Sequence, residues 1–238
     1  MLRKGKIMRR VLTVIALAAT GLLPLPATAQ TAPPTCFGRE VTILGTEGED
    51  QLLGTSGHDV ISALGADDSA YGVSSGLPDV KDWICGGTGS DFLNGDDGND
   101  WLDGERGNDR LDGLDGQDRL FGGGGNDWIT PHSGSDFADG GPGADDIENG
   151  FDRSPRWNSD TLHGGDGGDS VRGAISGGGS WGSDALYGDA GNDELDGRDS
   201  FEEASSTPDL VDGGPGNDQC WADPDDTVIN CEEVTVVS

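Results

Sequence analysis

The apolar positions of the chain recur at a fixed interval of nine residues. Residues 86–148 divide without a gap into seven nonapeptides, each with Leu, Ile or Ala in eighth place, Asp in sixth and Gly in fourth. A three-residue strand over positions 7 to 9 turns its middle side chain to one face and its neighbours to the other. The pattern therefore predicts short strands with position 8 in a core, joined by glycine-rich turns.

A period this short predicts a solenoid. Each nonapeptide supplies one turn and one strand, so two of them complete one coil of a flattened right-handed spiral. The expected fold class is all-β, a right-handed parallel β-roll with a short parallel sheet on each side. Its core is thin because each unit supplies one inward residue: Leu52, Ile61, Ala70, Ile84, Leu93, Leu102, Leu111, Leu120, Ile129, Ala138, Ile147, Leu162, Val171, Leu186, Leu195, Val211 and Cys220.

The nine-residue register breaks four times and resumes after each break. If each break enlarges one turn, the chain holds 17 units, and the enlarged turns lie near residues 72–81, 149–159, 173–183 and 197–208. All four precede even-numbered units, and odd and even units occupy opposite edges of the spiral. We therefore expect the inserted loops on one edge and the more regular row of turns on the other. The third unit lacks Gly at position 4, which makes its acid, Asp68, the doubtful one.

Charge decides what such a chain needs in order to fold. It has 45 Asp and Glu against 14 Lys and Arg, a net charge of -31, together with 43 Gly and few large apolar residues. A chain of this composition buries too little to offset its conformational entropy unless something neutralises the acids. The negative charge therefore disfavours nucleic acid and anionic membrane surfaces as partners, and a multivalent cation is the expected one.

The nonapeptides have the form GGxGxDxUx, where U is a bulky apolar residue, and the chain resembles the hemolysin-type calcium-binding (RTX) repeat family over roughly residues 36–233. The resemblance implies several Ca²⁺ ions, each between units n and n+2 on one edge. Its ligands would be turn carbonyls and position-6 carboxylates. Folding is then expected to be coupled to calcium binding. The implied ligands are Asp50, Asp59, Asp82, Asp91, Asp100, Asp109, Asp118, Asp127, Asp136, Asp145, Asp160, Asp169, Asp184, Asp193, Asp209 and Asp218.

The chain divides into four expected segments. Residues 1–29 read as a secretory signal, with a basic start, an apolar stretch and the small-x-small site Ala27-Thr28-Ala29. A membrane anchor is the alternative, disfavoured because the apolar stretch over residues 11–23 is too short to span a bilayer comfortably. A linker and N-terminal cap follow at 30–44, the roll at 45–221 and a C-terminal cap at 222–238. The protein is expected to be extracellular, and residues 232–237 vaguely resemble a C-terminal export signal of the family, so the export route stays open.

Four cysteines in a secreted chain suggest disulfides. Cys220 is inward in the last full repeat and Cys231 lies just beyond it, whereas Cys36 belongs to the N-terminal cap and Cys85 lies at an outward position 9. Among the pairings open to four cysteines we favour Cys36–Cys85 and Cys220–Cys231, because each would fasten a cap of the solenoid.

The outward position 7 carries an unexpected run of aromatic and Arg side chains. Cross-strand pairing with cation–π contacts explains such a run, and a sugar- or protein-binding stripe is the alternative. The residues are Val60, Trp83, Trp101, Arg119 and Phe137 in even units and Phe92, Arg110 and Trp128 in odd units.

Two functions from different classes follow from these patterns. The first is a secreted calcium-binding repeat protein. The second is a calcium-dependent adhesin or carbohydrate- or surface-binding module that uses the inserted loops. Catalysis is not expected: residues 178–182 match G-x-S-x-G, but they lie in a glycine-rich insertion and no His follows Ser180. His58 and His163 read as exposed residues rather than zinc ligands.

Overall fold

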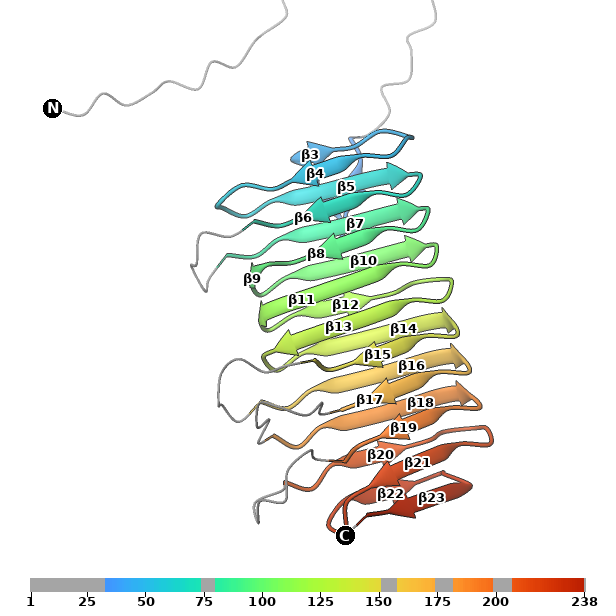
Figure 1. Cartoon of the computed structure of the whole chain (residues 1–238). Coiled ribbons are helices and arrows are strands. Elements are labelled where there is room, and N and C mark those ends of the chain that lie inside the picture. The colour runs from blue at the N-terminus through green and yellow to red at the C-terminus, as the bar shows by residue number, and fades with distance from the viewer. Residues whose placement is uncertain (1–32, 74–79, 151–157, 174–181, 199–206, 238) are drawn as a thin grey trace, which may run out of the picture. The chain divides into compact units, whose positions relative to one another are not determined.

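The repeats form two parallel β-sheets that face each other across a thin core. A computed structural model of the chain describes residues 33–73, 80–150, 158–173, 182–198 and 207–237, and these residues contain strands and no helix. They belong to one compact unit, Pro33–Ser238 (Figure 1). The predicted fold class, a parallel β-roll of nonapeptide repeats, is confirmed. The predicted signal over residues 1–29 lies outside the described residues.

We call one sheet the even sheet, because it holds the strands of the even units. Its ten strands pair in parallel in the order β22-β20-β18-β16-β14-β12-β10-β7-β5-β3. Their bounds are β3 (Ile43–Leu44), β5 (Val60–Gly65), β7 (Trp83–Thr88), β10 (Trp101–Arg106), β12 (Arg119–Phe121), β14 (Phe137–Gly143), β16 (Thr161–Gly167), β18 (Ala185–Gly191), β20 (Leu210–Asp212) and β22 (Thr227–Ile229).

The odd sheet runs in the order β23-β21-β19-β17-β15-β13-β11-β8-β6-β4, with β9 paired to β11, and all of its pairs are parallel. Its strands are β4 (Gln51–Leu53), β6 (Ser69–Tyr71), β8 (Phe92–Asn94), β9 (Asp97–Gly98), β11 (Arg110–Gly116), β13 (Trp128–Ser133), β15 (Asp146–Glu148), β17 (Ser170–Arg172), β19 (Glu194–Asp196), β21 (Gln219–Ala222) and β23 (Glu233–Val236).

The position-8 side chains form the core, as the pattern predicts. They stack in register within each sheet, so that Leu102 lies beside Leu120 and Leu111 beside Ile129. From Ile61 to Cys220 these side chains are at most 1% exposed. Leu52 is only partly buried, because it lies in the first coil and contacts neighbours on one side alone.

Several strands extend beyond the three residues that the pattern predicts. In the even sheet β14, β16 and β18 each run for seven residues, because the turns that follow them stack directly and their backbones also pair, as Gly141 does with Gly165. These turns lead into odd units, and none of them is enlarged. The regular stacking of the odd turns therefore adds main-chain hydrogen bonds to the strand ladder.

The enlarged turns all belong to connections of one kind. Residues 74–79, 151–157, 174–181 and 199–206 each come, in sequence, after a strand of the odd sheet and before a strand of the even sheet. Since all such connections lie along one edge of a roll, the flanking strands agree with the predicted loop-bearing edge. Most of each inserted loop lies outside the described residues.

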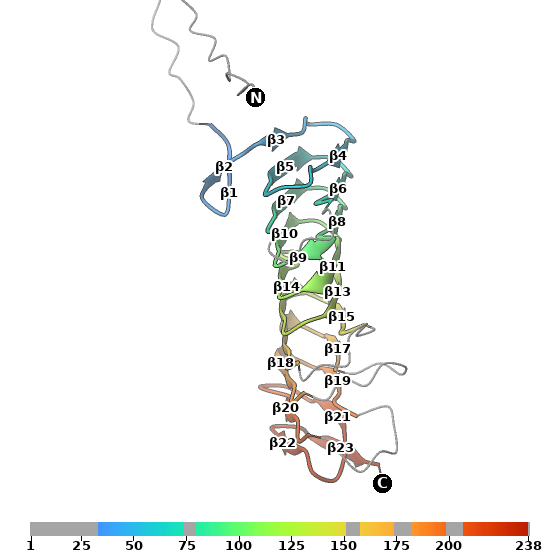
Figure 2. The same cartoon turned by 90° about the vertical axis from the view of Figure 1, so that its left-hand side faces the viewer.

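Both predicted disulfides are confirmed, and each fastens one end of the roll. Cys36 lies in an antiparallel hairpin of β1 (Thr35–Cys36) and β2 (Arg39–Glu40), and its bond to Cys85 holds this hairpin against the outer face of the even sheet (Figure 2). The hairpin thus covers a face of the roll, while β3 caps its end. At the other end, β22 and β23 continue the two sheets beyond the Cys220–Cys231 bond.

Candidate metal sites

The position-6 aspartates form two continuous rows, one along each edge. In each row the backbone N–H of one Asp donates to a carboxylate oxygen, Oδ1, of the Asp two units further on, at 2.7–2.9 Å. The odd row comprises Asp50, Asp68, Asp91, Asp109, Asp127, Asp145, Asp169, Asp193 and Asp218. The even row comprises Asp59, Asp82, Asp100, Asp118, Asp136, Asp160, Asp184 and Asp209. All sixteen predicted ligands therefore fall in these rows, and Asp68 joins them in the same geometry.

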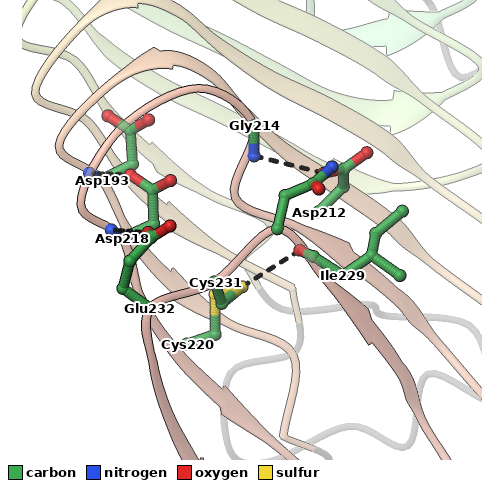
Figure 3. The surroundings of a disulfide bond; sticks show 9 residues. Asp193, Asp212, Gly214, Asp218, Cys220, Ile229, Cys231 and Glu232 are labelled. Atoms are coloured by element: carbon green, nitrogen blue, oxygen red, sulfur yellow. Dashed lines mark hydrogen bonds between the residues drawn. A yellow bond between two sulfur atoms is a disulfide. The ribbon is translucent and has the colours of Figure 1, made fainter.

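Each row ends on an acid that the sequence analysis did not include. The N–H of Asp209 donates to Asp226 at 2.9 Å. The N–H of Asp218 donates to Oε2 of Glu232 at 2.9 Å, as Figure 3 shows. The sequence does carry a signal for these two acids, because Val228 and Val234 each stand two residues after one of them, as position 8 stands after position 6. Both acids lack the glycine-rich turn that identifies the other units.

The second carboxylate oxygen, Oδ2, is the unusual feature of these rows. A buried carboxylate oxygen without a donor is costly, since it has lost its water and gained nothing in return. In the described part of the chain Oδ2 is buried and accepts no hydrogen bond in Asp68, Asp82, Asp91, Asp100, Asp109, Asp118, Asp127, Asp145, Asp169, Asp193 and Asp218.

A main-chain carbonyl meets this orphaned oxygen above the glycine at position 1. A Cβ atom on Gly122 would lie 2.5 Å from Oδ2 of Asp127 and 2.6 Å from the carbonyl oxygen of Gly140 in the next odd unit. We call this arrangement of two oxygens over a position-1 glycine the oxygen cradle. Oxygen atoms of this kind are the ligands that Ca²⁺ takes, so the donor set fits a hard cation.

The cradle is more regular on the odd edge, as the sequence predicts for the row without loops. There it recurs without a break at Gly86, Gly104, Gly122, Gly140, Gly164, Gly188 and Gly213. On the even edge it is present at Gly72, Gly95 and Gly113. A Cβ atom on Gly173 would lie 3.7 Å from Oδ2 of Asp184, and one on Gly197 would meet the Val211 side chain instead. In the third unit the methyl group of Ala63 occupies position 1.

Among the described contacts, Asp50, Asp59 and Asp160 receive protein donors on Oδ2 instead. Thr46 donates its backbone N–H and hydroxyl to Asp50 at 2.6 and 2.8 Å, and Thr55 does the same to Asp59 at 2.6 and 2.9 Å. The amide Nδ2 of Asn149 donates to Asp160 at 2.6 Å. These oxygens are therefore satisfied without a cation.

Burial raises the pKa of several carboxyl groups in the rows, and neighbouring carboxylates add to the effect. The ordinary value is 3.8; the pKa rises to about 6 or about 7 in six of these groups, and that of Asp118 rises well above the ordinary value. The pKa is about 6 in Asp82, Asp91 and Asp193 and about 7 in Asp100, Asp109 and Asp145. A cation beside Oδ2 would stabilise the charged carboxylate and lower its pKa again.

No group of three metal-binding side chains occurs among the described residues. A cation in a cradle would therefore depend on main-chain carbonyls to complete its shell. The imidazoles are engaged elsewhere: Nε2 of His132 lies 2.9 Å from Asp112, and Nδ1 of His163 lies 2.8 Å from Asp189. The G-x-S-x-G match lies largely outside the described residues.

The outward aromatic residues pair across strands, as the first interpretation predicts. The guanidinium of Arg110 lies 5.8 Å from the Phe92 ring and 4.7 Å from the Trp128 ring, and that of Arg119 lies 5.1 Å from the Trp101 ring. Trp83 is covered by the N-terminal hairpin and is 8% exposed, whereas Trp128 is 44% exposed. Cation–π contacts therefore account for most of the run of aromatic and Arg side chains at position 7, which we call the aromatic ladder.

Stacked glycine-rich turns with aligned carboxylates define a repeat protein of the calcium-binding β-roll class. The sequence model of the RTX calcium-binding nonapeptide repeat matches residues 44–73, 81–111, 94–129, 103–138, 122–153, 157–175, 178–200 and 204–229. These matches cover more than half of the chain, which therefore belongs to this family. No curated protein matched the chain. Nowhere in the described residues is there a helix of the length and apolarity that crossing a membrane requires.

Proposed function

We propose that this calcium-binding repeat protein folds only when Ca²⁺ occupies its oxygen cradles. The observation that carries the proposal is the odd row, where orphaned Oδ2 atoms and turn carbonyls converge at successive units. In the centre of the row the ions would lie between Asp91 and Asp109, Asp109 and Asp127, and Asp127 and Asp145. On the even edge Asp100 and Asp118 would hold a further ion.

The coupling of folding to calcium follows from what the fold lacks. One apolar side chain per unit gives a thin core, while the chain carries a net charge of -31 and buries two rows of carboxylates. Without a cation these charges repel and remain desolvated. Bound Ca²⁺ would remove both costs, so its binding free energy would become folding free energy.

We further propose that the protein acts outside the cell. Two disulfides suit an oxidising compartment. The basic and apolar start of the sequence, with its small-x-small site, suits export. The proposed role is binding rather than catalysis.

A second candidate function is calcium-dependent recognition of a surface polysaccharide or protein. Two observations favour it: the strands that flank the four enlarged turns run from the odd sheet to the even sheet in every case, and Trp128 is exposed on the odd sheet. Retention on cell-wall polysaccharide in Ca²⁺, lost in chelator, would support this function.

Far-UV circular dichroism of residues 30–238, titrated with Ca²⁺ and separately with Mg²⁺, tests the main proposal. We expect a coil-like spectrum in chelator that becomes β-like with Ca²⁺. The spectrum should stay coil-like with Mg²⁺, because Mg²⁺ demands a tighter octahedral shell and gives up its water reluctantly. A β spectrum already present in chelator would show that the caps and disulfides hold the fold and would overturn the coupling.

A further inference from the structure

Asn149 occupies the place of a position-1 glycine in the even row. Its N–H donates to the carbonyl of Arg172 at 3.1 Å, and its carbonyl accepts from the N–H of His132 at 2.8 Å. On the odd edge, Gly122 donates in the same way, at 2.9 Å, and the carbonyl of Gly140 accepts at 3.0 Å. The backbone of Asn149 therefore stacks like that of the glycines, and its Cβ enters the space that the oxygen cradle occupies in other units.

The Asn149 side chain is buried and contacts the Asp160 carboxylate. Asn149 is 3% exposed, and its Nδ2 lies 2.6 Å from Oδ2 of Asp160, the oxygen that accepts no hydrogen bond in most of the other described units. A primary amide supplies N–H donors and no net charge. It therefore satisfies Oδ2 of Asp160 with one hydrogen bond, while its own Oδ1 is buried and accepts none. Its Cβ stands where two oxygens face the bare position-1 glycine in other units.

We propose that Asn149 replaces a calcium ion at the twelfth unit, so that Asp160 holds its place in the even row without a metal. This inference rests on the proposed function, because it assumes that cradles with a position-1 glycine bind Ca²⁺. Asn149 stands at the start of one of the enlarged turns, where the even row loses its regular cradles. The row of Asp N–H to Oδ1 hydrogen bonds runs unbroken through Asp160 across that interruption.

The donors of Thr46 and Thr55 follow the same logic in the first two units. Both supply a hydroxyl and a backbone N–H to the Oδ2 of their own unit. The chain therefore satisfies Oδ2 with its own donors at the N-terminal end and at Asn149, and leaves it orphaned through the odd row from Asp68 onward.

A reciprocal pair of variants tests the replacement. Asn149→Gly recreates the glycine of a cradle, and Gly140→Asn places an amide beside Oδ2 of Asp145, 2.5 Å from where its Cβ would stand. Calcium bound per chain is measured by equilibrium dialysis and elemental analysis at saturating Ca²⁺, with circular dichroism as the check on folding. We expect Asn149→Gly to bind one ion more than the unmodified chain and Gly140→Asn to bind one fewer.

The variant Asn149→Ala separates the effect of the amide donor from the effect of a Cβ atom above position 1. It keeps a Cβ in the cradle and removes the donor, so we expect no additional ion and a lower melting temperature in saturating Ca²⁺. An unchanged ion count in Asn149→Gly or Gly140→Asn would overturn the inference, as would an Asn149→Ala variant that melts like the unmodified chain. If the unmodified chain bound no calcium at all, the proposed function itself would fail, and the inference with it.

Discussion

The glycine at position 1 carries the chemistry of each unit as much as the aspartate does. A Cβ atom there would meet a carboxylate oxygen of its own unit and a carbonyl oxygen of the unit beyond, as at Gly122, whereas a Cβ atom on Gly124 in the same turn would meet nothing closer than 4.0 Å. Contacts below 3 Å between Cβ and backbone oxygen require the turn to shift. Because glycine has no Cβ atom, position 1 leaves space for an ion.

The two glycines give a matched pair of substitutions in one turn. We expect Gly122→Ala to raise the calcium concentration at the folding midpoint about tenfold, equivalent to ~1.4 kcal/mol, because the methyl group displaces oxygens of the cradle. Gly124→Ala should leave the midpoint close to that of the unmodified chain. Calcium titrations followed by circular dichroism measure both. Equal midpoints for the two variants would show that the space above Gly122 has no part in binding.

At the scale of elements, the N-terminal hairpin determines which part of the aromatic ladder meets solvent. The β1–β2 hairpin buries Cys36 against Val60, Trp83 and Cys85, and the Arg39 guanidinium lies 3.7 Å from the Trp83 ring. The chain therefore covers the first rungs of the even-sheet ladder with its own residues. Any partner of the aromatic surface must bind elsewhere, and Trp128 on the odd sheet is the exposed rung.

Removal of the hairpin bond tests this arrangement. The variant with Cys36→Ser and Cys85→Ser should lose about 2–4 kcal/mol of stability in Ca²⁺, because a closed loop in the unfolded chain is opened. Its tryptophan emission should shift to the red as Trp83 meets water. The same pair of changes with Trp83→Phe added is the control and should show a smaller shift. A hairpin that stays in place without the bond would leave the emission unchanged.

The elements that repeat were predictable from the sequence, and the elements that occur once were not. The strands, the core and the Asp rows follow from one nonapeptide pattern, and the placement of four cysteines favoured both bonds. The position of the hairpin depends on packing against Trp83 and Trp101, which no local pattern encodes. Similarly, the Asn149–Asp160 hydrogen bond spans an enlarged turn, so it is visible only once the backbone has brought position 1 and position 6 together.

At the scale of the whole molecule, the two rows make stability depend on both calcium and protons. Burial raises the pKa of Asp100, Asp109 and Asp145 to about 7, from an ordinary value of 3.8. Between these values the metal-free folded chain binds protons that the unfolded chain does not. The resulting stabilisation is fully present below the ordinary pKa and is lost as the pH rises through the folded-state values.

Acid should therefore partly substitute for calcium. We expect chain that has been stripped of metal to show more β structure at pH 5 than at pH 8, and to regain it at pH 8 when Ca²⁺ is added; pH 5 lies between the ordinary and raised pKa values and above the isoelectric point of about 4.1. Circular dichroism at both pH values measures this. Asp109→Asn, which cannot titrate but keeps an oxygen for the N–H of Asp91, should weaken the pH dependence. Metal-free chain that is more ordered at pH 8 would contradict the electrostatic account of the rows.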